Sequence, residues 1–276
     1  MNQISVSKLC FSTLGCAGLS LSESARLGRS YGMHGIELRG IGGKTDVREI
    51  PDLAPWRAAE SRAVLDAAGI VPVVLGTSCK FHDPAKRRAA LDEGLAAAKA
   101  AARLGIPFIR VFGNDAKPDA ASAVRSVIDG IGELCAAAGD TAVLLEVHGD
   151  FNRSETLMPV IGALDGSGVC NFGLIWDVAH SDRSYGADWQ RFYNDIAPWV
   201  RHVHIKDHVR IAEGSGTRGF RLTLPGDGEI PIRDIARRLA LDGYSGYFSL
   251  EWERMWHPEL PPVEDALARF IEIMNF

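Results

Sequence analysis

The fold is decided by two short apolar runs, AVLLEVH (142–148) and FGLIWD (172–177), and by the helical segment that separates them. Two strands joined through a helix form a parallel pair. The same alternation of a β-type run with an Ala- and Leu-rich stretch continues from one end of the chain to the other. The strands that we expect are Leu9–Leu14, Gly35–Arg39, Val71–Gly76, Phe108–Gly113, Ala142–His148, Phe172–Asp177, Val200–Lys206 and Tyr247–Glu251.

Helical stretches follow these strands, and residues typical of helix ends mark their limits. Gly69 and Gly105 each come directly after a helical stretch, where glycine readily adopts the left-handed conformation. Eight strand–helix units predict an α/β fold, a (β/α)₈ barrel formed by residues 1–276 as one domain, and 276 residues suit such a barrel. A doubly wound open sheet is the alternative. Clear examples of expected helices are Asp52–Ala68, Pro84–Leu104, Asp119–Ala138 and Ile230–Leu241.

The composition excludes several classes of function. The chain is 46% hydrophobic and 24% charged and carries a net charge of −5, so no basic surface indicates binding to nucleic acid or to a membrane. Neither a signal peptide nor a membrane-spanning run is apparent. The five cysteines are odd in number and form no CxxC pair, which favours free thiols and a cytoplasmic protein. Homo-oligomer formation is possible.

Polar side chains gather at one end of the predicted barrel. Alternate residues of a strand share a face, so the apolar Val143, Leu145 and Val147 face outward and Glu146 faces inward. The same alternation places His204 and Glu251 inward on the seventh and eighth strands, and Asp177 stands at the C-terminal end of the sixth. With Glu146 this makes four polar residues at or near the C-terminal ends of four consecutive strands, where barrel enzymes keep their active sites.

Three carboxylates crowded into a buried mouth would repel one another and lose their hydration. A divalent cation resolves both problems, and three carboxylates with one imidazole suit Mn²⁺, Mg²⁺, Co²⁺ or Zn²⁺. The alternative interpretation is that each acid forms a salt bridge with a nearby Arg or Lys. We expect one divalent metal ion at this site.

Short motifs in this order resemble the xylose isomerase-like barrel superfamily, which includes sugar phosphate isomerases and epimerases. The resemblance covers nearly the whole chain, and the matching stretches are GIELRG, LLEVHGD, LIWDVAH, HVHIKD, PGDGEIPI and SLEWE. The superfamily also includes hydroxypyruvate isomerases, inosose and dehydroshikimate dehydratases, and endonuclease IV-like repair enzymes. The resemblance therefore implies the fold and the metal more firmly than the substrate.

The resemblance also implies roles for individual residues. The four residues above correspond to metal ligands, and Glu146 and Glu251 also correspond to the acid and base that move protons. His180 and Arg210 match residues that bind the substrate. His148 and Lys206 match less well, because epimerases differ at those positions.

The function that we expect is that of a metal-dependent isomerase or epimerase. It would act on a small sugar or sugar phosphate by removing a proton next to a carbonyl group. The alternative is a dehydratase that acts on an inosose or a dehydroshikimate-like compound, because that reaction also begins with removal of a proton next to a carbonyl group. A repair endonuclease and a non-catalytic barrel fit less well, since the chain is acidic and the set of four ligands is complete.

The remaining candidates have a structural explanation beside the functional one. Glu37 and Arg39 face inward in the second strand, and Arg110 does so in the fourth; they either contact substrate or form buried ion pairs. His82 either lines the pocket or caps the next helix. The long Gly- and Arg-rich segment Val209–Asp227 follows the strand of His204, and we expect it to cover the pocket as a lid.

Overall fold

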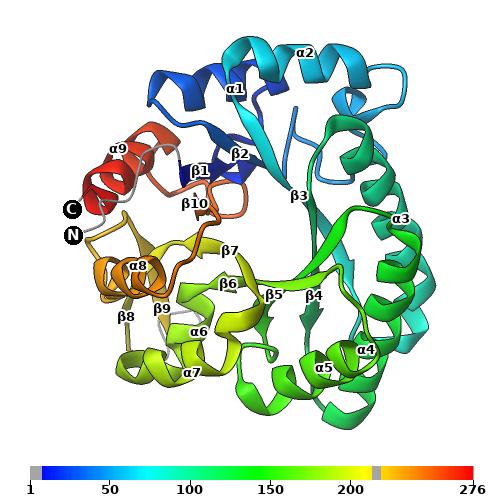
Figure 1. The fold of residues 1–276 in the computed structure, drawn as a ribbon. Coiled ribbons are helices and arrows are strands. Elements are labelled where there is room, and N and C mark those ends of the chain that lie inside the picture. Colours follow the sequence, from blue (N-terminus) through cyan, green and yellow to red (C-terminus); the bar gives the residue numbers. More distant parts are fainter. Residues whose placement is uncertain (1–7, 213–218, 276) are drawn as a thin grey trace.

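Eight parallel strands close into a barrel in the computed structural model, which describes residues 8–212 and 219–275. Around the barrel the strands follow the order β1-β10-β7-β6-β5-β4-β3-β2 (Figure 1). The predicted barrel is therefore confirmed, and the open sheet is wrong. The strands are β1 (Leu9–Ser12), β2 (Gly35–Leu38), β3 (Val71–Lys80), β4 (Phe108–Asn114), β5 (Ala142–Gly149), β6 (Phe172–Asp177), β7 (Val200–Ile205) and β10 (Phe248–Leu250).

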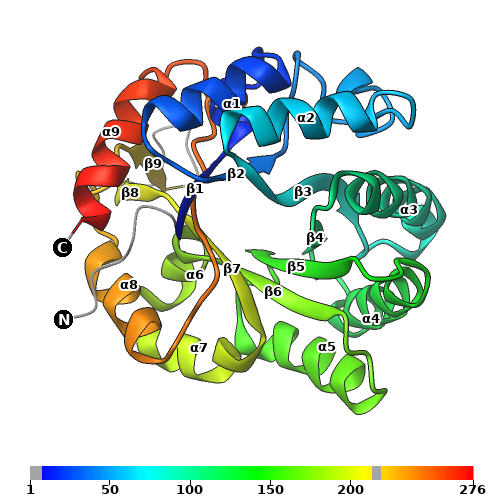
Figure 2. The same ribbon diagram turned by 45° about the horizontal axis from the view of Figure 1, so that its top comes forward.

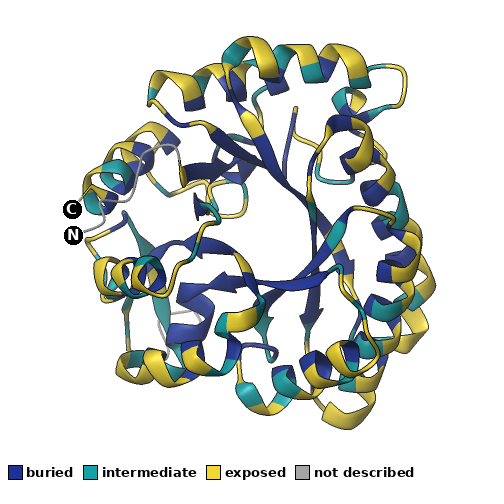
Figure 3. Cartoon of the chain, viewed as in Figure 1, coloured by how far each residue is buried: buried dark blue, intermediate teal, exposed yellow. Residues whose placement is uncertain are grey.

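Helices surround the barrel and cover its outer wall, as the two ribbon views show together (Figures 1 and 2). Their outer faces are exposed while the strands are almost entirely buried (Figure 3). The helices are α1 (Leu21–Ser30), α2 (Ala58–Ala68), α3 (Arg87–Leu104), α4 (Ala120–Ala137), α5 (Ser154–Gly166), α6 (Val178–Tyr185), α7 (Trp189–Ile196), α8 (Ile232–Leu241) and α9 (Val263–Met274).

The predicted boundaries differ from the observed ones mainly where a short 3₁₀ turn precedes a helix or follows a strand. Helices α2 and α3 begin later than expected, because Pro51–Leu53 and Pro84–Lys86 form separate 3₁₀ turns that start with proline. Strand β1 ends at Ser12, where the 3₁₀ turn Thr13–Cys16 begins. Helices α2 and α3 end as predicted, with the following glycines at φ 64° and 66°.

The alternation of side chains along the strands gives the barrel two kinds of interior. Val143, Leu145 and Val147 belong to the main core between the strands and the helices, as the sequence predicts. Leu144 and Ile175 belong to a small separate cluster inside the barrel. Toward the C-terminal ends of the same strands the inward residues are polar. The interior of the barrel is therefore apolar in its middle and polar at the C-terminal end of the strands.

The segment expected as a lid contains regular structure. Strands β8 (Asp207–Arg210) and β9 (Phe220–Thr223) pair in antiparallel fashion, with Arg210 opposite Phe220. The middle of the predicted lid, residues 213–218, lies outside the described residues. All five cysteines are free, as predicted. Within the described ranges, no helix combines the length and hydrophobicity that crossing a membrane requires.

Candidate metal centre and active site

Glu146, Asp177, His204 and Glu251 meet at the C-terminal mouth of the barrel. Each of them offers one ligand atom, and these four atoms all lie within 4.8 Å of one another. The barrel register brings them together, because Asp177 pairs with His204 across β6 and β7, and His204 pairs with Ser249, two residues before Glu251. All four side chains are buried.

A hydrogen bond to Glu37 decides how His204 presents its ring. The Nε2 atom of His204 lies 2.9 Å from Oε2 of Glu37. A carboxylate only accepts hydrogen bonds, so Nε2 carries the proton. The Nδ1 atom faces the acids, 3.4 Å from Oε2 of Glu251 and 3.9 Å from Oε2 of Glu146. This atom is buried without a hydrogen-bond partner, which suits a metal ligand.

Two buried cations also contact the acids. Nη1 of Arg110 lies 2.9 Å from Glu146 and 3.4 Å from Glu251. Nζ of Lys206 lies 2.8 Å from Oδ2 of Asp177 and 2.6 Å from Oε2 of Glu251. The salt bridges that formed the alternative interpretation are therefore present. In the absence of a metal, His204 pairs with Glu251 in the same way, and the charges of Glu251 and Glu37 raise its pKa well above the ordinary value despite its burial. The metal interpretation therefore rests on the convergence of the four ligand atoms.

The carboxylates differ in how readily they ionise. Burial raises the pKa of Glu146 to about 7, against the opposing effect of Arg110. Burial also raises the pKa of Asp177. The pKa of Glu251 is well below its usual value despite its burial, because His204 and Lys206 favour its charged form. The pKa values of Glu146 and Glu251 are thus shifted in opposite directions within one cluster, an arrangement typical of sites that move protons.

The donor set fits a divalent cation. Oδ1 of Asp177 accepts hydrogen bonds from the backbone N–H groups of Ala179 and His180 and caps α6, while Oδ2 faces the cluster. Three carboxylate oxygens and one imidazole nitrogen are ligands that Mn²⁺, Mg²⁺, Co²⁺ and Zn²⁺ accept. A second group, formed by Glu37, His202 and His204, also has ligand atoms within 4.8 Å of one another. In it both Nε2 atoms already bond to Glu37, so we interpret it as a hydrogen-bonded support.

The family model of the xylose isomerase-like TIM barrels matches residues 25–273. The chain belongs to this family. An inosose dehydratase of Bacillus velezensis is 29% identical over 140 residues, and this match covers 47% of the chain and only 47% of that relative.

Two solved structures share the fold of this xylose isomerase-like barrel. A probable 3-DHS dehydratase, AsbF of Bacillus anthracis, superposes with a TM-score of 0.78 at 18% identity, covering 98% of this chain and 99% of that one. The IolI protein, solved with a bound zinc atom, superposes with a TM-score of 0.77 at 19% identity and the same coverage. At these identities the two structures support the fold alone.

Two of the predicted substrate residues lie side by side in the mouth of the xylose isomerase-like barrel. The rings of His148 and His180 are 4.0 Å apart. Both line a cavity of about 460 Å³, and His148 also lines a cavity of about 100 Å³ beside Glu146, Lys206 and Glu251. Burial, followed by the charge of Lys206, lowers the pKa of His148 to about 3, so its ring is neutral.

Three other predicted substrate residues line neither cavity. Glu37 is fully buried beneath His204. Arg210 is 44% exposed and pairs with Asp182 and Glu229. Nε2 of His82 lies 3.9 Å from Asp115. Contact of these residues with a substrate stays a prediction.

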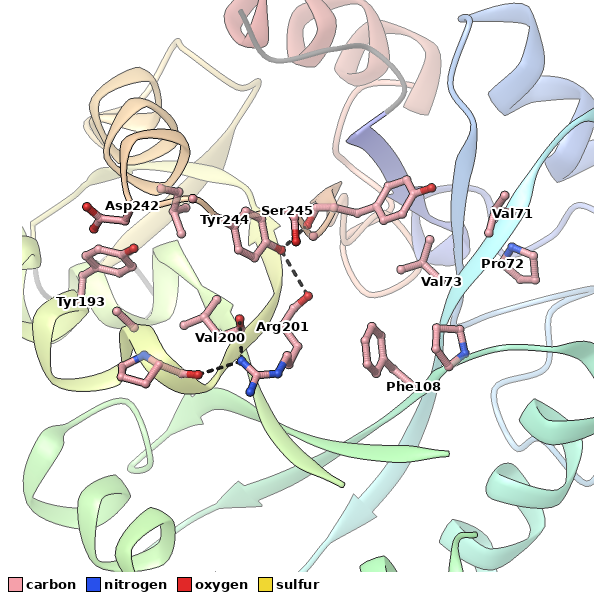
Figure 4. Close-up of a pocket in the computed structure, with 17 residues that line it drawn as sticks. Val71, Pro72, Val73, Phe108, Tyr193, Val200, Arg201, Asp242, Tyr244 and Ser245 are labelled. Carbon is pink, nitrogen blue, oxygen red and sulfur yellow. Dashed lines mark hydrogen bonds between the residues drawn. The ribbon is translucent and has the colours of Figure 1, made fainter. Parts of the chain in front are cut away.

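Another cavity lies at the opposite end of the barrel. It has a volume of about 730 Å³ and is lined by the first residues of three strands, Val71, Phe108 and Val200 (Figure 4). Tyr244 and Arg201 are among the other residues that line it. Active sites of these barrels lie at the C-terminal ends of the strands, so this cavity does not compete with the cluster as the catalytic site.

Proposed function

We propose that this protein is a metal-dependent enzyme that removes a proton next to the carbonyl group of a small sugar or sugar phosphate and thereby isomerises or epimerises it. The observation that carries the proposal is the convergence of the four ligand atoms, with Nδ1 of His204 facing the acids. A divalent ion held by Glu146, Asp177, His204 and Glu251 would supply Lewis-acid polarisation of the carbonyl group. The zinc atom bound by IolI supports such a site.

Glu146 and Glu251 would move the protons. Glu146 lies on β5 and Glu251 directly follows β10, and these strands are separated around the barrel by β6 and β7. The two carboxylates therefore reach the centre from walls that are nearly opposite. One can take the proton from one face of the substrate, and the other can return it from the opposite face.

The cations next to these carboxylates would stabilise the negative charge that develops on the substrate oxygen. Lys206 and Arg110 are both buried, so their charges act where water does not screen them. The neutral rings of His148 and His180 can exchange hydrogen bonds with hydroxyl groups of the substrate. The burial of the cluster also limits access of water to a reactive intermediate.

Metal analysis of the purified protein, followed by a screen of ketoses, ketose phosphates and inososes in deuterated water, tests the proposal. We expect deuterium from solvent in the carbon next to the carbonyl group. Glu146→Gln and Glu251→Gln should each lower kcat by about 10²–10⁴-fold, while Glu133→Gln, on the exposed face of α4, should not. Conversion without any exchange of label would indicate a hydride shift and overturn the two-glutamate mechanism.

Dehydration is the second candidate. The relative from Bacillus velezensis is named an inosose dehydratase, and the AsbF structure is that of a probable 3-DHS dehydratase. This reaction also starts with removal of the proton next to the carbonyl group, but a hydroxyl group on the next carbon then leaves. Product mass separates the two outcomes, because a dehydrated product lacks one water and an epimer does not.

A further inference from the structure

A polar chamber adjoins the metal cluster on the side of β3 to β6. It has a volume of about 460 Å³, within the range of small-molecule sites, whereas the cavity beside the acids has only about 100 Å³. His148 lines both, so a substrate bound at the cluster can extend past this ring into the chamber. The chamber is lined by Lys80, Asn114, Asp115, His148, Gly149, Asn152, His180 and Arg183.

Two cations of this chamber have no acidic partner within the described ranges. Lys80 is an exposed residue of the wall and forms no ion pair with another described residue. Arg183 lies 3.5 Å from Nδ1 of His180 and packs over the ring of Phe220, and its buried Nε has no hydrogen-bond partner. Asp115 is the one acid of the wall, and it accepts a 2.8 Å hydrogen bond from Asn114. Two positive charges are thus left for a ligand.

The wall of the chamber is held by backbone contacts. Asn114 ends β4 with φ 75°, which is uncommon for a residue other than glycine. Its carbonyl oxygen accepts a 2.8 Å hydrogen bond from the N–H of Asp150, and a Cβ atom on Gly149 would lie 2.3 Å from that oxygen. Nδ2 of Asn152 donates to the carbonyl oxygen of His180 at 2.8 Å. These contacts fix the shape of the wall before a ligand binds.

We propose that the chamber is an anion subsite, which binds the carboxylate or phosphate group at the end of the substrate remote from the reacting carbonyl. The planar guanidinium of Arg183 suits two oxygens of either group, and Lys80 adds a point charge. Placing the anion on a substrate rests on the proposed function. The subsite itself rests on the two unpaired cations and on the cavity that they line.

Binding of inorganic phosphate to the metal-free protein tests the subsite without any reference to catalysis. Lys80→Gln and Arg183→Gln should each weaken binding by about tenfold or more. Lys99→Gln and Arg103→Gln, which change exposed cations of α3, are the matched controls and should not. Asp115→Asn removes the negative charge from the wall and should tighten binding. Equal phosphate affinity in all of these folded variants would overturn the proposal.

The metal-loaded protein then distinguishes the two anions. Titration with fructose, with fructose 6-phosphate and with a cyclic keto acid should show tighter binding of at least one anionic probe, and Lys80→Gln should remove that preference. The preferred probe identifies phosphate or carboxylate. Equal affinity for all three probes would count against the subsite. Anion preference without solvent deuterium exchange would leave the subsite standing and reject the proposed function.

Discussion

Oε2 of Glu37 accepts a 2.9 Å hydrogen bond from Nε2 of His204, although the two residues lie on β2 and β7, well separated around the barrel. The same oxygen accepts from His202 at 3.0 Å and from the hydroxyl group of Ser249 at 3.2 Å. A carboxylate that bonds to the far nitrogen of a metal-binding histidine fixes its tautomer and increases its basicity. Glu37 would therefore act on the metal through His204.

Glu37→Gln should weaken binding of Mn²⁺ by about 10–100-fold, the range typical of such supporting residues. The reason is that a neutral amide holds the imidazole less firmly than a carboxylate does. Calorimetric titration of the metal-free protein measures the effect. Ser249→Ala is the control, because Ser249 contacts the same oxygen of Glu37 without a hydrogen bond to His204. A Glu37→Gln variant with wild-type affinity would reject this role.

The candidate ligands could be predicted because the information is local. Glu146 and His204 face inward by the alternation of their strands, and Asp177 and Glu251 lie where apolar runs end. The barrel itself follows from the count of strand–helix units. These inferences need only the order of residues along each strand.

The partners of the inward charges could not be predicted, because they depend on how distant strands align across the barrel. Glu37 does pair with buried ionisable side chains, as the sequence allows, but its partners are two histidines of β7 and not an arginine or lysine. Arg110 does form a buried ion pair, but with the proposed catalytic acids. Arg39 donates to Ser78 and to the carbonyl oxygen of Thr45. A single sequence contains no signal for the register that selects these partners.

Lys206→Met should destabilise the metal-free protein by about 3–5 kcal/mol, because it leaves buried carboxylates without their counter-charge. Added Mn²⁺ should raise the melting temperature of this variant more than that of the wild type, since the metal would neutralise the same acids. Thermal unfolding with and without Mn²⁺ measures both effects. Lys99→Met controls for the loss of a lysine. An equal rise in both proteins would contradict a shared role of Lys206 and the metal.

One thiol should react much faster than the others in the folded protein. Cys170 is exposed, whereas burial raises the pKa of Cys16 to about 11 and that of Cys79 and Cys135 to about 12. A raised pKa leaves less of the reactive thiolate at neutral pH, so the slow thiols should react faster as pH rises. Mass spectrometry after iodoacetamide treatment at pH 8 should find label mainly on Cys170. Rapid native labelling of Cys79 would contradict this burial.

The connection after the β8–β9 hairpin depends on one buried acid. The carboxylate of Asp207 accepts hydrogen bonds from the backbone N–H groups of His208 at 2.9 Å, Gly226 at 2.9 Å, Gly228 at 3.0 Å and Ile230 at 3.1 Å. Nε2 of His208 in turn lies 3.0 Å from Asp182 on α6. The hairpin is thus tied at its base both to the following loop and to the helix that Asp177 caps.

Asp207→Asn should loosen the start of the β8–β9 hairpin. The amide group of asparagine would turn an N–H donor toward the backbone N–H groups, which would then be buried without acceptors. Each lost partner costs about 1–3 kcal/mol. Gly228→Ala should act similarly, since a Cβ atom there would lie 2.1 Å from Oδ1 of Asp207. Asp227→Asn is the control, because the side chain of Asp227 forms a salt bridge with Arg269 at the surface. Limited proteolysis measures the loosening, and both variants should be cut faster within 224–230 than the control. If metal and a sugar ligand together protect 209–227 from cleavage in the wild type, they should protect this segment less in the two variants. Cleavage at the same rate in all three variants would show that Asp207 does not hold the hairpin, and ligand that leaves wild-type cleavage unchanged would reject the lid.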